Sequence, residues 1–135
     1  MTITDPIYFY SRTSAFHEFS NFAPFGFEED GAYWPTVEHY FQAQKFPGAE
    51  NAGYREKIRK ATTPKEAKAL GRTRNIVIRP DWEEVKEDIM LAALRKKFAA
   101  SKLRELLLST GDRPLVEASG AAAGPAKAGT ASAYC

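Results

Sequence analysis

The stretch EHYFQAQKF, Glu38 to Phe46, raises the main question about the fold, because three polar residues lie along one line of an aromatic helix. With Glu38 at zero and about 100° per residue, Gln42 falls at about 40° and Lys45 at about −20°. Phe41 and Phe46 flank this line, so the helix is apolar nearly all round and is expected to be buried. The polar line indicates a satisfied internal pair, the wall of a polar pocket or a solvated helix edge.

The composition is that of one ordinary globular domain. The chain has 135 residues, of which 44% are hydrophobic and 27% charged, enough for a single core. No run approaches the roughly 20 apolar residues of a membrane span, and the N-terminus lacks a signal-peptide pattern. We therefore expect a cytoplasmic protein without membrane contact. The net charge of +2 is too small to indicate a nucleic-acid partner by itself, and the basic runs REKIRK and RKK are expected to be solvated helix faces.

Metal-binding residue types are scarce in the sequence. The single cysteine is the last residue, Cys135, so a disulfide within the chain and a CxxC site are excluded. His17 and His39 have no partners at ligand spacing, and Glu18 after His17 does not belong to an HExxH motif. The sequence predicts neither a metal nor another cofactor.

Strand and helix signals divide the chain into a β-rich beginning and a helical remainder. Residues 7–11, IYFYS, are typical of a short strand, and prolines and glycines punctuate the segment that follows. Helix signals begin with an N-cap at Thr36 and then cover 49–60, 63–71, 80–100 and 101–108. They predict an α+β fold, a mainly helical single domain packed on a small antiparallel sheet near the N-terminus.

The longest predicted helix, residues 80–100, carries an apolar stripe along one face. Its acidic residues come early and its basic residues late, as the helix dipole favours. Trp34 and Tyr40, outside this helix, are assigned to packing. The stripe predicts that the helix faces the core with Trp82, Val85, Ile89, Leu94 and Phe98.

The composition changes abruptly after Ser119. The segment GAAAGPAKAGTASAYC, residues 120–135, has small side chains and no periodicity, so it buries too little surface to offset its ordering entropy. We expect a folded domain over residues 1–119 and a disordered tail over 120–135.

Several segments together resemble the NADAR domain family. They are FHEFSNFAPFGF, WPTVEHYFQAQKF, AKALGR, DW, IMLAALRKKF and LLLSTGDRPLVEAS, in this order, and the resemblance covers residues 7–119. It implies an N-glycosidase. The substrates it implies are phosphorylated ribosylamino pyrimidine intermediates of riboflavin biosynthesis, or ADP-ribose attached to guanine, including guanine in nucleic acid.

The resemblance gives the polar line a chemical meaning. Breaking a C1′–N bond develops positive charge on the ribose, so a carboxylate beside the sugar stabilises the transition state. Glu38, in the EHY motif, is the candidate for this role and for proton transfer. Lys45, in the KF position, is the candidate nucleophile, which would form a Schiff base with the ring-opened ribose. Direct attack by water that Glu38 activates is the alternative.

Other residues are candidates for substrate binding, each with a structural alternative. Gln42 or Asn21 would hold sugar hydroxyls, although Asn21 equally suits a turn cap. Trp82 would stack on the base, or else be a core residue at a helix start. Arg72 and Lys97 lie in family motifs and would contact phosphate, or else form surface salt bridges.

The C-terminal end departs from the family pattern. After LVEAS the family resemblance implies a segment like SPxDxxWGxG and then GxNxLGxLL, whose Pro, Asp and Trp-Gly would fall near Gly120, Ala122 and Pro125. An acid attributed to the active site and a last core helix are thereby missing. If residues 120–135 are translated back into codons and the codons are read in a frame shifted by two bases, the new frame permits Trp-Gly and, further along, GNRLGLL. We hypothesise a deletion with a frameshift, which sequencing the coding region tests.

Two other functions stay open from the sequence. A non-catalytic domain that binds ADP-ribose or ribonucleotides would keep the pocket without the missing acid. A structural or partner-binding remnant would keep only the fold. The sequence does not indicate an oligomeric state.

Overall fold

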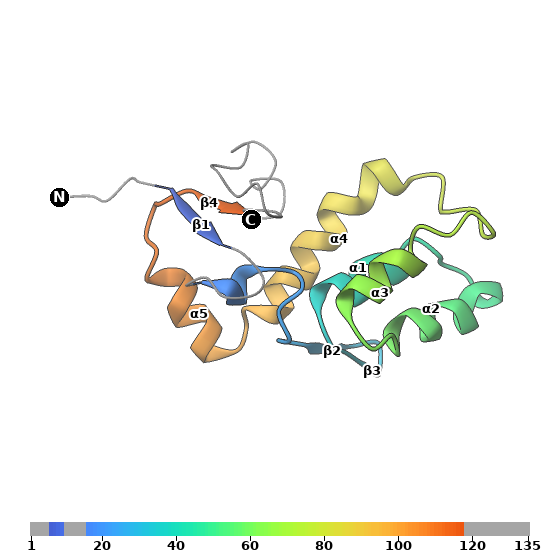
Figure 1. Cartoon of the computed structure of the whole chain (residues 1–135), viewed down its shortest axis with the longest axis horizontal. Coiled ribbons are helices and arrows are strands. Elements are labelled where there is room, and N and C mark those ends of the chain that lie inside the picture. Colours follow the sequence, from blue (N-terminus) through green and yellow to red (C-terminus); the bar gives the residue numbers. More distant parts are fainter. Residues whose placement is uncertain (1–5, 10–15, 118–135) are drawn as a thin grey trace.

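The computed structural model describes residues 6–9 and 16–117. In these ranges the chain forms five α-helices, two short 3₁₀ helices and four short strands (Figure 1). The α+β class predicted from the sequence is confirmed. The predicted tail and the remaining residues lie outside the described ones. Among the described helices, none is both long and apolar enough to cross a membrane.

An antiparallel hairpin forms the small sheet predicted near the N-terminus. Strand β2 (Phe27–Glu29) pairs with β3 (Ala32–Trp34). The turn between them consists of Asp30 with φ 54° and Gly31 with φ 77°. Two left-handed residues suit the right-handed twist of the flanking strands, and Asp-Gly is a favoured pair there.

A second pair of strands joins the two ends of the described chain. Strand β1 (Ile7–Phe9) runs parallel to β4 (Leu115–Glu117), as Figure 1 shows beside α5. Ile7, Phe9 and Val116 are buried in this pair. The sequence predicted β1 but not β4, because three residues without a local turn partner give no periodic signal.

Helix α1 lies at the centre of the helical part and contacts α2, α3 and α4. Its predicted N-cap is confirmed, since Thr36 Oγ1 accepts a hydrogen bond from the His39 backbone N–H. The helix ends two residues before Lys45, which lies in the following turn. The helices are η1 (His17–Phe19), α1 (Val37–Ala43), η2 (Ala49–Asn51), α2 (Ala52–Arg59), α3 (Pro64–Leu70), α4 (Trp82–Lys97) and α5 (Ser101–Leu108).

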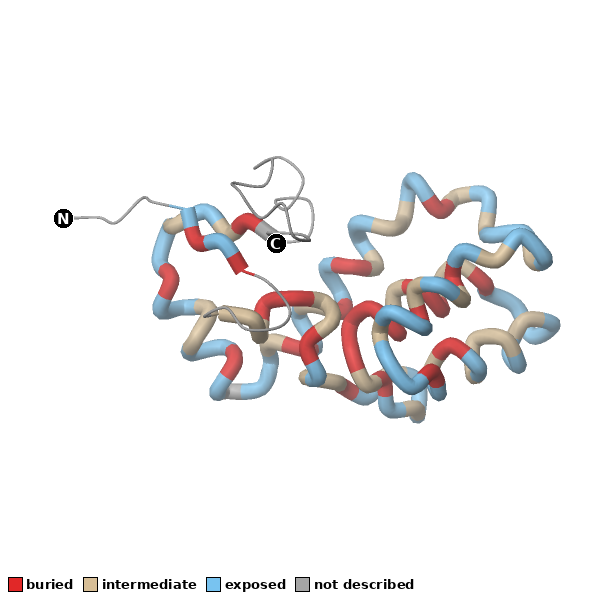
Figure 2. Tube along the Cα trace, viewed as in Figure 1, coloured by how far each residue is buried: buried red, intermediate tan, exposed pale blue. Residues whose placement is uncertain are grey.

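The main core surrounds α1, where Figure 2 shows buried residues concentrated. His39 is buried there, and its Nε2 donates to the Ala61 carbonyl at 3.0 Å. Tyr40 packs edge-on against Trp34, as its packing assignment predicted. The buried core cluster consists of Phe27, Trp34, Val37, Ala43, Phe46, Ile58, Ala61, Ala67, Met90 and Ala93.

The buried face of α4 differs from the predicted stripe. Trp82 is buried as predicted, but Val85, Ile89, Leu94 and Phe98 are only partly buried. The helix instead buries Met90, Ala93 and Lys97 beside Trp82. The predicted stripe included neither Met90 nor Ala93, and Lys97 was expected to contact phosphate or to form a surface salt bridge.

Candidate active site

Helix α1 presents Glu38 in its first turn as a buried carboxylate. The residue is 7% exposed, and its backbone N–H donates to the Asn21 carbonyl at 3.1 Å. One turn later, Gln42 Nε2 donates to Glu38 Oε1 at 2.8 Å. Because residues four apart share a helix face, this bond fixes the orientation of the carboxylate.

Gln42 leaves one polar atom without a partner. The residue is 5% exposed, and its Oε1 is buried without a hydrogen-bond partner in the described part of the chain. The bond to Glu38 fixes which end of the amide is the nitrogen, since a carboxylate oxygen accepts. A buried unpaired acceptor is costly.

Gly71 brings α3 close to this amide. A Cβ added at Gly71 would overlap Oε1 of Gln42. The Gly71 carbonyl also accepts a hydrogen bond from Lys45 Nζ at 3.4 Å. Gly71 thus touches both of the side chains that flank Glu38 along the predicted polar line.

Lys45 lies in the turn after α1 with its side chain half-buried. Its Nζ is 5.8 Å from the centroid of the Trp82 ring. Burial lowers the pKa of Lys45; nearby Glu38 raises that pKa, while Arg72 and Lys68 lower it further, and the net direction is down. A larger fraction of this amine is therefore unprotonated near neutral pH than of an ordinary lysine.

A cavity of about 210 Å³ opens beside Glu38 and Gln42. Three predicted site residues, Asn21, Glu38 and Gln42, come together in its wall. Lys68 also lines it. The sequence did not predict this residue, because a lysine on a short helix carries no pattern that separates it from a solvated surface lysine. The full lining is Asn21, Phe22, Glu38, Phe41, Gln42, Lys68 and Met90.

Three other predicted site residues, Lys45, Trp82 and Arg72, are not in the lining of this cavity. Trp82 is 6% exposed and packs at 4.9 Å between ring centroids on Phe41, which does line the cavity. This burial agrees with the alternative of a core residue at a helix start. Arg72 is exposed, and its charge acts on Lys45.

Lys97 corrects one sequence-based expectation. The surface salt bridge considered for it is wrong, because the residue is only 2% exposed. Its Nζ donates to the Ser20 carbonyl at 2.8 Å. Lys97 is also absent from the lining of the cavity beside Glu38.

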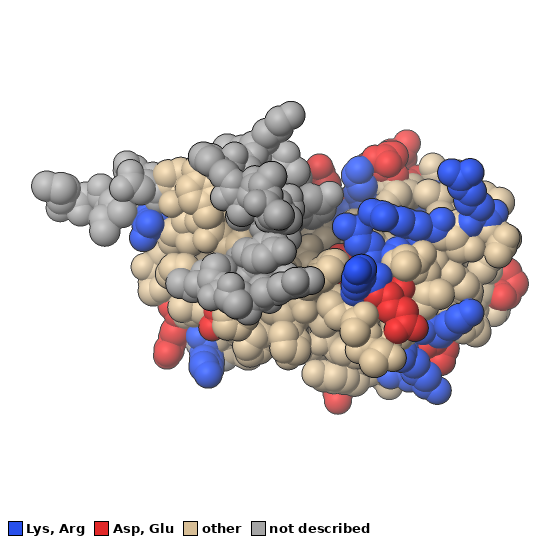
Figure 3. All heavy atoms as spheres, viewed as in Figure 1, with Lys and Arg blue, Asp and Glu red and all other residues tan. Residues whose placement is uncertain are grey.

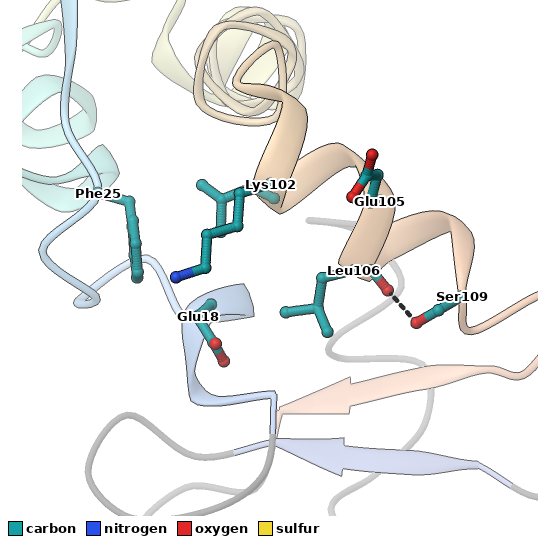
Figure 4. A pocket seen from close by; sticks show the side chains of 7 residues that line it. Glu18, Phe25, Lys102, Glu105, Leu106 and Ser109 are labelled. Carbon is teal, nitrogen blue, oxygen red and sulfur yellow. Dashed lines mark hydrogen bonds between the residues drawn. The ribbon is translucent and has the colours of Figure 1, made fainter.

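A second cavity, of about 320 Å³, lies between η1 and α5 (Figure 4). Lys102 extends across it toward Phe25 and Glu18. Its charged residues are exposed or half-buried, and the Ser109 hydroxyl donates to the Leu106 carbonyl of its own helix. This cavity is larger but holds no buried charged group. Its lining is Glu18, Phe25, Lys102, Leu103, Glu105, Leu106 and Ser109.

The described ranges contain no group of three or more His, Cys, Asp or Glu residues that could hold an ion. The polar groups in the lining of the cavity beside Glu38 are a carboxylate, two side-chain amides and the amine of Lys68, and the charges of Glu38 and Lys68 both act on the Lys45 amine. Such groups can transfer protons, attack a carbon centre and hold hydroxyl or anionic groups of a ligand.

Two bacterial relatives share most of this chain. It is 49% identical over 112 residues to an N-glycosidase of Nostoc punctiforme. The aligned residues cover 82% of this chain and 72% of the relative. It is 48% identical over 112 residues to the N-glycosidase YbiA of Escherichia coli, with 82% and 68% covered. A maize protein named as the chloroplastic riboflavin biosynthesis protein PYRR is 43% identical over 129 residues, covering 86% of this chain and 21% of the relative.

The fold and a family profile agree with these relatives. The solution structure of Escherichia coli YbiA matches with a TM-score of 0.74 at 47% identity, covering 86% of this chain and 68% of YbiA. The profile of the NADAR domain matches residues 8–123. The N-glycosidase activity predicted from the sequence is confirmed at the level of the family, and the non-catalytic alternative is not favoured. The chain therefore belongs to the NADAR domain family.

Proposed function

We propose that this protein cleaves the C1′–N bond of a phosphorylated ribosylamino pyrimidine, with Glu38 and Lys45 as its catalytic residues. The observation that carries the proposal is the pairing of a buried, oriented carboxylate with a half-buried amine of lowered pKa. An amine of perturbed pKa beside a cavity is typical of catalytic sites. The names of the relatives as N-glycosidases and a riboflavin biosynthesis protein support the substrate class.

Glu38 would serve the departing base and the sugar. As the C1′–N bond breaks, positive charge grows on the ribose, and a fixed carboxylate at the cavity wall stabilises that charge. Because Gln42 already holds Oε1, little reorganisation of the carboxylate is needed during the reaction. The same group would pass a proton to the leaving nitrogen or take one from water.

Lys45 would form the covalent intermediate. Its free amine adds to C1′ of the ring-opened glycosylamine, so a bond from Nζ to C1′ forms while the bond from C1′ to the base nitrogen breaks. The base leaves with a proton, and water then hydrolyses the lysine Schiff base to free ribose phosphate and regenerate the amine. The lowered pKa of Lys45 favours the free amine that this step needs.

The size of the cavity supports a partly enclosed ligand. Its volume of about 210 Å³ is below the roughly 300 Å³ at which pockets for drug-sized ligands begin. It suits the sugar, with the base outside against the aromatic walls. Phe41, backed by Trp82, gives a stacking surface at this edge.

Trapping the intermediate tests this proposal. The protein is incubated with 5-amino-6-ribosylaminouracil phosphate and sodium borohydride, and its mass is then measured. We expect release of the pyrimidine and a reduced pentose phosphate adduct on Lys45. Turnover without an adduct, together with an unimpaired Lys45→Ala variant, would exclude the covalent route in favour of water activated by Glu38.

A parallel incubation with ADP-ribosylated guanosine decides between the two substrate classes. Faster release of guanosine than of the pyrimidine would assign the protein to ADP-ribose removal. Absence of turnover with both, despite ligand-dependent thermal stabilisation, would instead support a binding domain. The cytoplasmic location expected from the sequence stays a prediction.

A further inference from the structure

Lys68 is a cation at the cavity wall whose function none of the preceding chemistry explains. It projects from α3 into the lining shared with Glu38 and Gln42. Its Nζ lies 5.9 Å from the centroid of the Phe22 ring, and within the described residues it has no carboxylate within ion-pair distance. By contrast, Arg59 and Arg79 are paired with Glu56 and Asp81.

The surroundings of Lys68 favour an anion. Its charge and that of Arg72 both act on Lys45, and Figure 3 shows Lys and Arg side chains gathered over α3 and the loop that leads to α4. Glu38 is the one acidic residue that the described part of the chain contributes to the lining. One of its oxygens is already held by Gln42. Within the described ranges, this half-buried cation therefore forms no ion pair with a carboxylate.

We propose that Lys68 binds a phosphoryl group of the substrate and thereby selects phosphorylated ribosides. This inference rests on the proposed function, because it assigns the anionic end of the same ligand. An ammonium is a point-charge phosphate donor, and its hydrogen bonds to phosphate are charge-assisted. The phosphoryl oxygens come from a 5′-phosphomonoester or from the diphosphate of an ADP-ribosyl group.

The test compares substrate preference in matched variants. For wild type, Lys68→Gln and Lys65→Gln, kcat/KM is measured with 5-amino-6-ribosylaminouracil phosphate and with its dephosphorylated form. Lys65 is an exposed residue on the same helix and outside the lining. We expect Lys68→Gln to reduce the preference for the phosphorylated substrate about tenfold or more. Lys65→Gln should keep the preference of wild type.

The ratio of kcat/KM for the phosphorylated and the dephosphorylated substrate separates phosphate binding from other effects of the Lys68 charge. Removing Lys68 also changes the electrostatic field at Lys45, but that effect acts on both substrates equally. Lys68→Arg retains the cation and should keep most of the preference. An equal loss with both substrates, or the same loss in Lys65→Gln, overturns the assignment.

A binding measurement separates failure of this inference from failure of the proposed function. Ribose 5-phosphate, ADP-ribose and ribose are titrated calorimetrically into each variant. We expect Lys68→Gln to weaken one of the two phosphorylated ligands about tenfold and to leave ribose unchanged; the ligand affected identifies the source of the phosphate. If binding weakens in this way but no substrate is turned over, the proposed glycosidase activity is rejected and the phosphate site at Lys68 is retained. Wild-type protein that binds neither phosphorylated ligand overturns the phosphate site.

Discussion

The two cavities of this protein differ in what their walls hold. The cavity against α5 is the larger, about 320 Å³ against about 210 Å³, yet its charged side chains are exposed or half-buried. The smaller cavity against α1 contains a buried carboxylate that an amide holds at 2.8 Å. An amine with a lowered pKa lies beside it.

The groups suited to catalysis lie where polar side chains are buried, and not where the cavity is largest. A buried carboxylate and an unpaired buried amide oxygen lower stability unless something compensates them. Exposed Lys102 and Glu105 carry no such cost. The residues whose burial lowers stability are therefore the ones to which we assign the reaction.

Removing the carboxylate charge should have the largest effect. Glu38→Gln keeps the size of the side chain and an acceptor for Gln42, but it loses proton transfer and charge stabilisation. We expect kcat to fall about 10³-fold or more, with little change in melting temperature. The measurement is release of the pyrimidine base from the phosphorylated riboside.

The counterpart lies in the other cavity. Glu18→Gln removes an acid from the wall against α5 and should leave kcat within twofold of wild type. Equal losses in the two variants would mean that the two cavities do not differ in the way proposed.

Removing the amine should have the next largest effect. Lys45→Ala deletes the nucleophile, and only attack by water that Glu38 activates remains, so we expect a loss of about 100-fold or more and no borohydride adduct. Lys102→Ala deletes an amine from the wall of the larger cavity and should retain both activity and adduct. An adduct that persists in Lys45→Ala would place the covalent chemistry on another lysine.

Gly71→Ala tests how closely α1 and α3 must approach. The added methyl overlaps the Gln42 amide, and it disturbs the carbonyl that accepts from Lys45. We expect kcat to fall about tenfold to 100-fold, since small misplacements of catalytic groups are costly. Gly53→Ala is the matched control, because a Cβ at that glycine of α2 meets nothing within 4 Å. This control should be fully active and slightly more stable.

Local sequence rules predicted the parts of the fold that local interactions determine. The predicted cap at Thr36 accepts a hydrogen bond from a backbone N–H group, and so does Thr63 at the start of the predicted helix 63–71. The line from Glu38 to Gln42 follows from helix geometry alone. The parallel partner of β1 lies more than a hundred residues along the chain, so no local pattern identifies it.

The candidate site was predicted in part for the same reason. Glu38 and Gln42 meet because they are one turn apart, and the family motifs added Asn21. Lys68 and Gly71 come from another helix, and their closeness to α1 depends on how α1 and α3 pack. Lys97 was misjudged because a lysine is rarely expected to be almost fully buried, although its amine is satisfied by the Ser20 carbonyl.

The pH dependence should provide the smallest and most specific effect. Burial and the charges of Arg72 and Lys68 lower the pKa of Lys45, so kcat/KM should rise with pH along a limb that lies below the ordinary lysine pKa. Arg72→Gln removes one positive charge that disfavours the protonated amine. The pKa of Lys45 should therefore rise, and the limb should move to higher pH.

The direction of this shift separates an electrostatic role of Arg72 from a role in substrate contact. Loss of a contact would lower kcat/KM at every pH without moving the limb, whereas the electrostatic role costs activity only below the shifted pKa. Arg74→Gln removes an exposed charge that is absent from the causes of the Lys45 shift, and its profile should match that of wild type. A limb that moves to lower pH in Arg72→Gln would contradict the assignment of Lys45 as the titrating group, because removing a neighbouring cation cannot make an amine easier to deprotonate.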